Sequence, residues 1–172
     1  MEEVVLVNEQ DVAIGRMEKM EAHEKGLLHR AFSIFIFNSK GEMLLHQRAI
    51  EKYHSGGLWT NTCCSHPRVN ESLQEATNRR LQEEMGLSCL MDKVFQFIYK
   101  AELDQGLTEH ELDHVFVGIS DNEPSPNPEE VASFRYASLE AIDQEILEQP
   151  QLFTEWFKIC YPRVAQLIRE QW

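Results

Sequence analysis

The sequence predicts an α+β fold, an α/β/α sandwich in which helices flank a mixed β-sheet. Three observations predict it: a β-hairpin pattern in the first third, a helix with clear start and end signals in the middle, and further strands followed by helices. The chain has 172 residues, of which 42% are hydrophobic and 26% are charged. These values are typical of a soluble globule, and without repeats or a long linker we expect a single domain over residues 1–172.

The predicted sheet begins with a short strand at Val4–Val7 and continues with a hairpin. Apolar residues fill Phe32–Phe37, a turn is expected at residues 38–41, and the second strand covers Met43–Arg48. Residues 53–67 are expected to form a loop.

The central helix has a signal at each end. Ser72 is suited to the N-cap, Glu75 three residues later completes a capping box, and Gly86 suits the left-handed position after the last turn. The rest of the chain is expected to add three strands and two helices, at Lys93–Leu103, Leu112–Ile119, Ser133–Ala137, Ser138–Glu148 and about residues 154–171. Pro162 is expected to kink or split the last helix.

The net charge argues against several classes of partner. The sum is 16 − 29 = −13, which speaks against a general nucleic-acid binder and against an anionic membrane surface. The negative net charge does not exclude a small anionic ligand. Charges are screened over about 8 Å, so a local cluster of cationic side chains or a metal ion outweighs the net charge of the whole chain. The start of the chain lacks a basic signal region, and no apolar run spans a bilayer, so we expect a cytoplasmic protein.

The four cysteines, Cys63, Cys64, Cys89 and Cys160, are irregularly spaced and are expected to be reduced. Two of them are adjacent in the segment WTNTCCSHP. A disulfide between neighbours would strain the peptide bond that joins them. Residue type alone leaves three roles open for these two cysteines: metal ligand, reactive thiol or small buried side chain.

Three histidines and two glutamates have the residue types of a mixed nitrogen and oxygen metal site. His23 and His29 are expected in an N-terminal loop, and His66 follows the cysteine pair. Glu109 and Glu111 are two positions apart, which on an extended chain places both carboxylates on one face. The other histidines are expected to be ordinary polar side chains without a role in such a site: His46, His54, His110 and His114.

The central helix resembles a Nudix box, the pattern G-x5-E-x7-R-E-U-x-E-E-x-G-U with U aliphatic. The matching positions are Ser65, Glu71, Arg79, Arg80, Leu81, Glu83, Glu84, Gly86 and Leu87. Ser65 stands where glycine is expected, and Arg80 replaces a glutamate that in the family binds a catalytic cation. The resemblance therefore implies the Nudix fold but argues against hydrolysis. On residue type alone, the same pattern is typical of a solvated helix face.

Four segments together resemble the type I isopentenyl-diphosphate isomerases, which have the Nudix fold but isomerise their substrate. The segments are AFSIFIFNSKGEMLLHQRA, GGLWTNTCCSHP, RRLQEEMG and EHELDHVF, and the similarity runs from about residue 4 to about residue 160. The resemblance implies conversion of isopentenyl diphosphate to dimethylallyl diphosphate through a tertiary carbocation, in isoprenoid precursor biosynthesis. The implied partner is this small prenyl diphosphate, and we expect a monomer or a weak homodimer.

The resemblance also implies roles for individual residues. Cys64, two positions before His66, takes the position of a catalytic cysteine, and Cys63 is a bystander. Glu111 with Tyr99 is expected to protonate the alkene, and Cys64 to remove the second proton. The implied ligands of a Mn²⁺ or Zn²⁺ ion are His23, His29, His66, Glu109 and Glu111. Glu84 is implied as a ligand of Mg²⁺ shared with the diphosphate, and the implied substrate-binding residues are Lys19, Arg48, Lys52, Arg80 and Trp156.

Two rival functions are compatible with part of this pattern. A Nudix pyrophosphohydrolase acting on a nucleotide or prenyl diphosphate would share the fold, but Arg80 and the cysteine motif argue against it. A metal-stabilised binding domain would use the histidines and glutamates structurally. Release of phosphate would identify the first, and the lack of isomerisation with metal added would identify the second.

Overall fold

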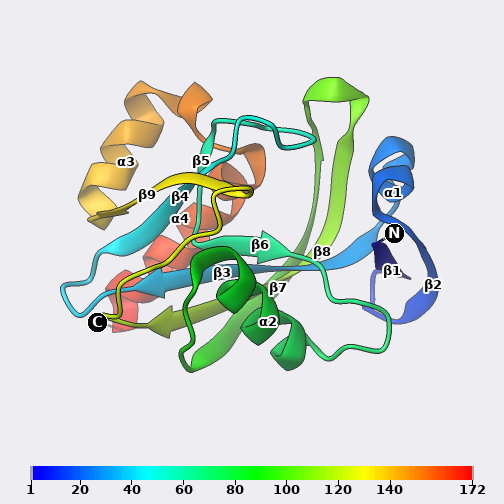
Figure 1. Cartoon of the computed structure of the whole chain (residues 1–172), viewed down its shortest axis with the longest axis horizontal. Coiled ribbons are helices and arrows are strands. Elements are labelled where there is room, and N and C mark those ends of the chain that lie inside the picture. Colours follow the sequence, from blue (N-terminus) through cyan, green and yellow to red (C-terminus); the bar gives the residue numbers. More distant parts are fainter. Residues whose placement is uncertain (1, 172) are drawn as a thin grey trace.

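The computed structural model describes residues 2–171, and within them nine strands form one mixed sheet (Figure 1). The strands are β1 (Glu3–Val7), β2 (Ala13–Glu18), β3 (His29–Phe37), β4 (Met43–Arg48), β5 (Trp59–Thr60), β6 (Cys63–Ser65), β7 (Met91–Glu102), β8 (Thr108–Ile119) and β9 (Val131–Ala137). The helices are α1 (Lys19–Lys25), α2 (Leu73–Met85), α3 (Leu139–Glu148) and α4 (Glu155–Gln171), with 3₁₀ turns at Asp104–Gly106 and Pro150–Leu152.

Strand β3 is the centre of the sheet. It pairs in parallel with β8 from His29↔Glu111 to Phe37↔Ile119, and antiparallel with β6 through Ser33↔Cys64. At its ends it meets β1 and β4, and β4 in turn pairs with β5 and β9. Because β3 pairs with both β8 and the cysteine-bearing strand β6, it brings together residues that are far apart in the sequence.

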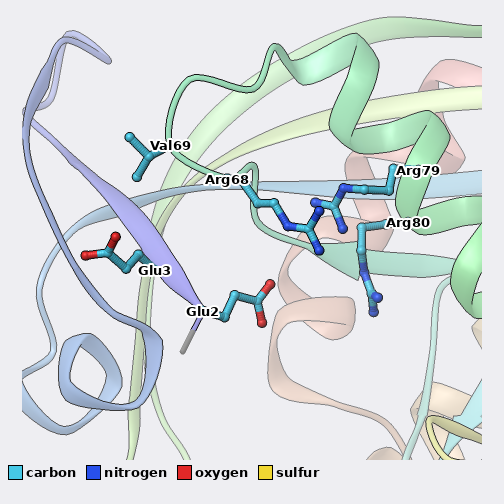
Figure 2. A pocket seen from close by; sticks show the side chains of 6 residues that line it. All are labelled: Glu2, Glu3, Arg68, Val69, Arg79 and Arg80. Atoms are coloured by element: carbon cyan, nitrogen blue, oxygen red, sulfur yellow. The ribbon is translucent and has the colours of Figure 1, made fainter.

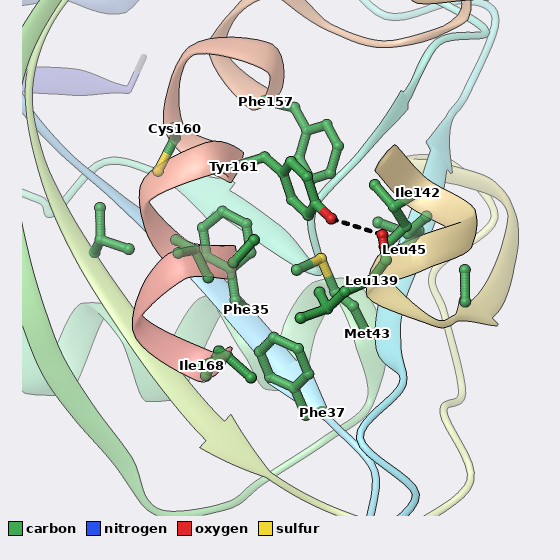
Figure 3. Close-up of a cluster of buried hydrophobic side chains, with 14 of the residues drawn as sticks. Phe35, Phe37, Met43, Leu45, Leu139, Ile142, Phe157, Cys160, Tyr161 and Ile168 are labelled. Atoms are coloured by element: carbon green, nitrogen blue, oxygen red, sulfur yellow. Dashed lines mark hydrogen bonds between the residues drawn. The ribbon is translucent and has the colours of Figure 1, made fainter. Parts of the chain in front are cut away.

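Both faces of this central strand are buried, as its continuous apolar run requires. Phe35 and Phe37 pack with α3 and α4, where the Tyr161 hydroxyl donates to the Leu139 carbonyl oxygen at 3.0 Å (Figure 3). Ile34 and its neighbours on the opposite face pack against α2. Each such large side chain contributes roughly 1.5–3 kcal/mol by leaving water. The predicted α/β/α sandwich is therefore confirmed.

Helix α2 ends where its sequence signals predict. The Ser72 side chain accepts from the Glu75 amide, and the Glu75 side chain accepts in return, which completes the capping box. Gly86 closes the helix at φ 64°, and a Cβ there would lie 2.6 Å from the Ser125 carbonyl oxygen, so only glycine fits. Pro162 does not split α4, which is one helix over Glu155–Gln171.

Several elements differ from the sequence prediction, and strand β2 is among those that were not predicted. His23 lies on helix α1 rather than in a loop: the Glu18 side chain caps the first turn, and Gly26 ends the helix in the left-handed region. His29 is the first residue of β3. The expected loop at residues 53–67 contains the short strands β5 and β6. No helix within residues 2–171 is both long enough and apolar enough to cross a bilayer.

Candidate active site

Four buried side chains converge at one end of the sheet. His23 comes from α1, His29 from the start of β3, His66 from the residue after β6, and Glu109 from β8. One nitrogen or oxygen atom from each lies within 4.8 Å of the others. His23 Nε2 is 2.7 Å from Glu109 Oε1, and the two Nε2 atoms of His29 and His66 are 3.3 Å apart.

The hydrogen bonds of this cluster fit a divalent cation. His23 Nδ1 lies 2.7 Å from the Lys19 carbonyl oxygen and His29 Nδ1 lies 2.9 Å from the Leu27 carbonyl oxygen, so each ring holds its proton on Nδ1. Each Nε2 then turns a lone pair toward the centre, which is the arrangement of metal-binding histidines. Glu109 Oε2 is buried without a hydrogen bond from the described residues. Converging lone pairs and an unpartnered carboxylate oxygen repel one another unless a cation lies between them.

Glu111 borders this cluster and links it to β7. Its Oε2 lies 2.9 Å from His66 Nε2, and Tyr99 donates its hydroxyl to Oε1. Burial alone would raise the pKa of Glu111, but the neighbouring imidazoles of His29 and His66 hold it well below its usual value. Burial and the Glu111 charge raise the pKa of Glu109 well above its usual value. Of the two carboxylates on this face of β8, Glu109 therefore binds its proton more tightly than Glu111 does.

The adjacent cysteines point to opposite faces of β6. Cys63 is fully buried in the core beneath α2, with its sulfur 3.6 Å from Glu84 Oε2. Cys64 faces the site and donates to Asn61 Oδ1 at 3.0 Å. Burial raises the pKa of both thiols. The alternation of a strand thus separates the pair, and only Cys64 of the two lines the cavity described next.

A cavity of about 30 Å³ lies beside the metal cluster. Its walls include Cys64, Tyr99, Glu111 and Trp156. Trp156 is placed by the start of α4, where the Thr154 amide donates to the Trp59 carbonyl oxygen at 2.9 Å. The Arg48 guanidinium stands over the Trp156 ring at 5.1 Å. The volume is about that of one water molecule, so a five-carbon group needs the walls to open.

Three of the predicted phosphate-binding cations pair with carboxylates. Arg80 on α2 donates to Glu84 Oε2 at 2.8 Å and to both oxygens of Glu130, and Lys52 lies 4.0 Å from Glu130. Lys19 forms an ion pair with Glu2 at 3.0 Å. Burial raises the pKa of Glu84 to about 7 even though Arg80 lowers it.

An open cavity of about 520 Å³ is lined in part by Arg80. Figure 2 shows Arg68, Arg79 and Arg80 gathered along one side of it and the Glu2 carboxylate facing them. Arg79 is held by Glu71 through two hydrogen bonds of 2.7 and 2.9 Å, and Arg80 is held by Glu84 and Glu130. This cavity is large enough for a diphosphate.

Two residues of the site were missed by the sequence prediction. His54 is 2% exposed and lies 3.2 Å from Glu109 Oε1, and burial together with the Arg48 charge lowers its pKa to about 2. Glu130 contacts two of the predicted phosphate-binding cations. His46 was expected to be a satisfied polar side chain, but only its Nδ1 is bonded, to the Thr62 carbonyl oxygen at 2.9 Å, whereas Nε2 faces Glu84 at 3.6 Å.

The expected site residues otherwise come together. The five expected metal ligands form or border the cluster, and Cys64, Tyr99 and Trp156 line the small cavity. His110 and His114 lie outside it: His110 Nδ1 contacts the Gly26 carbonyl oxygen, and His114 Nε2 lies 3.0 Å from Asp11. No short-range pattern marks His54, since a single histidine in a loop carries no periodicity.

Known proteins resemble this chain in sequence and in fold. The NUDIX domain model matches residues 27–157. An isopentenyl-diphosphate Delta-isomerase from Pectobacterium atrosepticum is 53% identical over 94% of this chain and 90% of its own length. A second one, from Photorhabdus laumondii, is 48% identical over 100% of this chain and 98% of its own.

Solved structures support the fold alone. A protein from Deinococcus radiodurans superposes with a TM-score of 0.75 at 19% identity, covering 98% of both chains. A MutT protein from Methanosarcina mazei superposes with a TM-score of 0.66 at 21% identity, covering 81% of this chain and 94% of that one. The match to the NUDIX domain and the sequence identity to curated relatives over nearly the whole length show that the chain belongs to the isopentenyl-diphosphate Delta-isomerase family of NUDIX-domain proteins.

Proposed function

We propose that this chain isomerises isopentenyl diphosphate to dimethylallyl diphosphate, a step that supplies precursors of isoprenoids. One observation carries the proposal: Cys64, the Tyr99–Glu111 pair and Trp156 all line the same small cavity. Double-bond migration needs two proton-transfer groups and an aromatic wall, and this cavity offers both. Water must be excluded when substrate is bound, because it would otherwise capture the carbocation.

The reaction moves one proton in and one proton out. A proton adds to the terminal alkene carbon, which becomes a methyl group and leaves a tertiary carbocation. A proton then leaves the carbon next to the diphosphate-bearing one, and its electron pair forms the new double bond. We assign the first transfer to Glu111 with Tyr99 and the second to Cys64, and Trp156 faces the cation, a contact worth on the order of 2 kcal/mol when desolvated.

Two metal sites are part of the proposal. His23, His29, His66, Glu109 and Glu111 would hold Mn²⁺ or Zn²⁺, for which a set of imidazoles and carboxylates is suited. When bound, this ion supplies positive charge that keeps Glu111 oriented. Glu84 would hold Mg²⁺ only together with the diphosphate, because one carboxylate is too few ligands for that ion.

The diphosphate is assigned to four cationic side chains, of which Arg80 lines the larger cavity and Arg48 the smaller one. Arg80 and Arg48 offer guanidinium groups, and Lys19 and Lys52 offer ammonium groups, for charge-assisted hydrogen bonds to phosphate oxygens. Carboxylates partner three of these cations: Glu130 and Glu84 hold Arg80, Glu130 lies 4.0 Å from Lys52, and Glu2 holds Lys19. We infer that phosphate oxygens replace part of these partners when substrate binds.

The rival hydrolase is disfavoured by the contacts of Arg80. A NUDIX hydrolase uses helix glutamates to bind the cations that activate water, whereas here an arginine pairs with the remaining glutamate at 2.8 Å. The deciding experiment follows the unmutated protein with isopentenyl diphosphate in D₂O. Deuterium entering the methyl group without phosphate release supports isomerisation, and phosphate release faster than exchange contradicts it.

A variant separates the two proton-transfer groups. If Glu111 with Tyr99 adds the first proton, Cys64→Ala still exchanges the terminal methylene hydrogens of isopentenyl diphosphate with D₂O, although little product forms. If Cys64 adds that proton, the same variant shows no exchange, and the assignment of the two groups is reversed.

A further inference from the structure

His54 lies where the loop between β4 and β5 passes the metal cluster, and the structure holds it there firmly. Its side chain is 2% exposed. The following residue is anchored by a hydrogen bond from the Ser55 amide to Asp104 Oδ1 at 2.8 Å. The imidazole meets the Trp156 ring edge-on, with the centroids 5.5 Å apart. The ring therefore has little freedom to turn away from the cluster.

The Nε2 atom of His54 is directed at Glu109. It lies 3.2 Å from Glu109 Oε1 and makes no aligned hydrogen bond with residues 2–171. The Nδ1 atom lies 3.1 Å from the Ser55 hydroxyl. When this hydroxyl donates to Nδ1, the ring proton is on Nε2, the atom that faces the carboxylate. A buried N–H group without an acceptor is unfavourable, and a small rotation of either side chain gives it one.

Hydrogen bonds hold the Glu109 carboxylate only in part. Its Oε1 is shared with His23 Nε2 at 2.7 Å, and its Oε2 is buried without a hydrogen bond from the described residues. A carboxylate that binds a cation rotates freely about its last bond unless a second group holds it. Hydrogen bonds from outside the ligand set commonly provide that restraint and strengthen metal binding.

We propose that His54 is a positioning residue of the metal site, whose Nε2–H donates to the Glu109 carboxylate and holds it turned toward His23, His29 and His66. The proposal rests on the proposed function, which places a divalent cation among these residues. The His54 ring also lines the small cavity, but the proposal assigns it no proton transfer.

The test measures metal binding directly. The full chain is stripped of metal with a chelator and reloaded with Co²⁺, whose visible absorption reports the ligand geometry and whose affinity is measured against a competing chelating dye. His54→Ala is expected to weaken Co²⁺ binding by about 10- to 100-fold. His54→Gln, which keeps an N–H donor at similar reach, is expected to recover most of the affinity. Melting of each metal-free variant checks that it is folded.

The chain offers a matched control. His110 follows Glu109 directly on β8, but its Nδ1 contacts the Gly26 carbonyl oxygen at 3.1 Å and it is outside the cluster. His110→Ala is expected to bind Co²⁺ like the unmutated protein.

Two outcomes would overturn the proposal. One is a folded His54→Ala protein with unchanged Co²⁺ affinity. The other is a folded His54→Gln protein that binds as weakly as His54→Ala, since the imidazole would then be a direct ligand. Failure of the unmutated protein to bind Co²⁺ would remove the proposed metal site itself. Co²⁺ binding without isomerisation would contradict the proposed reaction and leave the assignment of His54 standing.

Discussion

Tyr99 and Glu111 are register partners in the antiparallel pair β7–β8, and the Tyr99 hydroxyl donates to the Glu111 carboxylate. The sheet thus fixes this hydrogen bond, because neither side chain changes its neighbour without a shift of strand register. Tyr99 also stacks on Phe97 with ring centroids 5.5 Å apart, so its ring position does not depend on the hydroxyl.

Tyr99→Phe should therefore remove the hydroxyl proton and leave the aromatic ring in place in the wall of the small cavity. We expect the isomerisation rate constant to fall about a hundredfold, in the range of lost acid–base assistance, with little change in metal content. The measurement is kcat with metal analysis in parallel. Tyr136→Phe on β9 is the control, and equal rates for the two variants would show that the Tyr99 hydroxyl has no role in proton transfer.

The opposite directions of the two adjacent cysteines make a second prediction. Cys64→Ala should abolish product formation, because it removes a proton-transfer group from the cavity. Cys63→Ala should keep most activity and lose some stability, since its sulfur packs in the core beneath α2. Turnover and thermal melting of both variants check this. Equal loss of turnover in two folded proteins would contradict the separation by β6.

Arg80 is predicted to bind the diphosphate. Arg80→Ala should weaken substrate binding by roughly 1.5–3 kcal/mol, the value of a charged hydrogen bond, and should create no hydrolase. Arg80→Glu should abolish isomerisation by repelling the diphosphate. KM, turnover and phosphate release are measured together, with the exposed Arg16→Ala on β2 as control. An unchanged KM in Arg80→Ala would limit this arginine to a structural role as partner of Glu84 and Glu130.

The raised pKa of Glu84 predicts a pH dependence of stability. Its folded-state pKa is about 7 against an ordinary value of 4.5, so between these values the folded protein binds the proton more tightly than the unfolded chain. Ionising this buried carboxyl therefore lowers the free energy of unfolding as pH rises from about 4.5 to 7, by up to about 3 kcal/mol.

Glu84→Gln should remove that loss. Chemical unfolding of the metal-free protein and of this variant at pH 5 and pH 8 gives the comparison, and the variant should gain stability relative to the unmutated protein at the higher pH. The same pH dependence in both proteins would mean that Glu84 ionises normally. Glu75→Gln, in the exposed capping box of the same helix, tests whether any lost carboxylate has this effect.

The parts of the fold that local sequence determines could be predicted. Phe32–Phe37 is apolar at every position but Ser33, and Ser72, Glu75 and Gly86 mark the ends of α2 by capping chemistry that acts within a few residues. The short helix α1 could not be predicted, because seven residues carry no apolar period and depend on tertiary contacts for stability. Strand β6 has three residues and likewise exists only because β3 offers it an edge.

In the candidate site, too, only the features that depend on local sequence could be predicted. The spacing of Glu109 and Glu111 predicts that they share a face, and the motif around Cys64 carries a family resemblance. His54 and Glu130 reach the site only through loop conformation and helix packing, which no local pattern records. Their partners, Glu109 and Arg80, are 55 and 50 positions away in the chain.

The parallel pairing of β3 with β8 also determines when the site can appear during synthesis. His29 and Glu111 are partners across 111 − 29 = 82 positions, and closing so long a loop is slow compared with forming a hairpin. A ribosome must release most of the chain before β3 gains this neighbour, and until then its apolar residues and open edge stay available to other chains. Mutations that slow the docking of β8 should therefore reduce the yield of folded protein in cells more than they reduce the stability of molecules that have already folded.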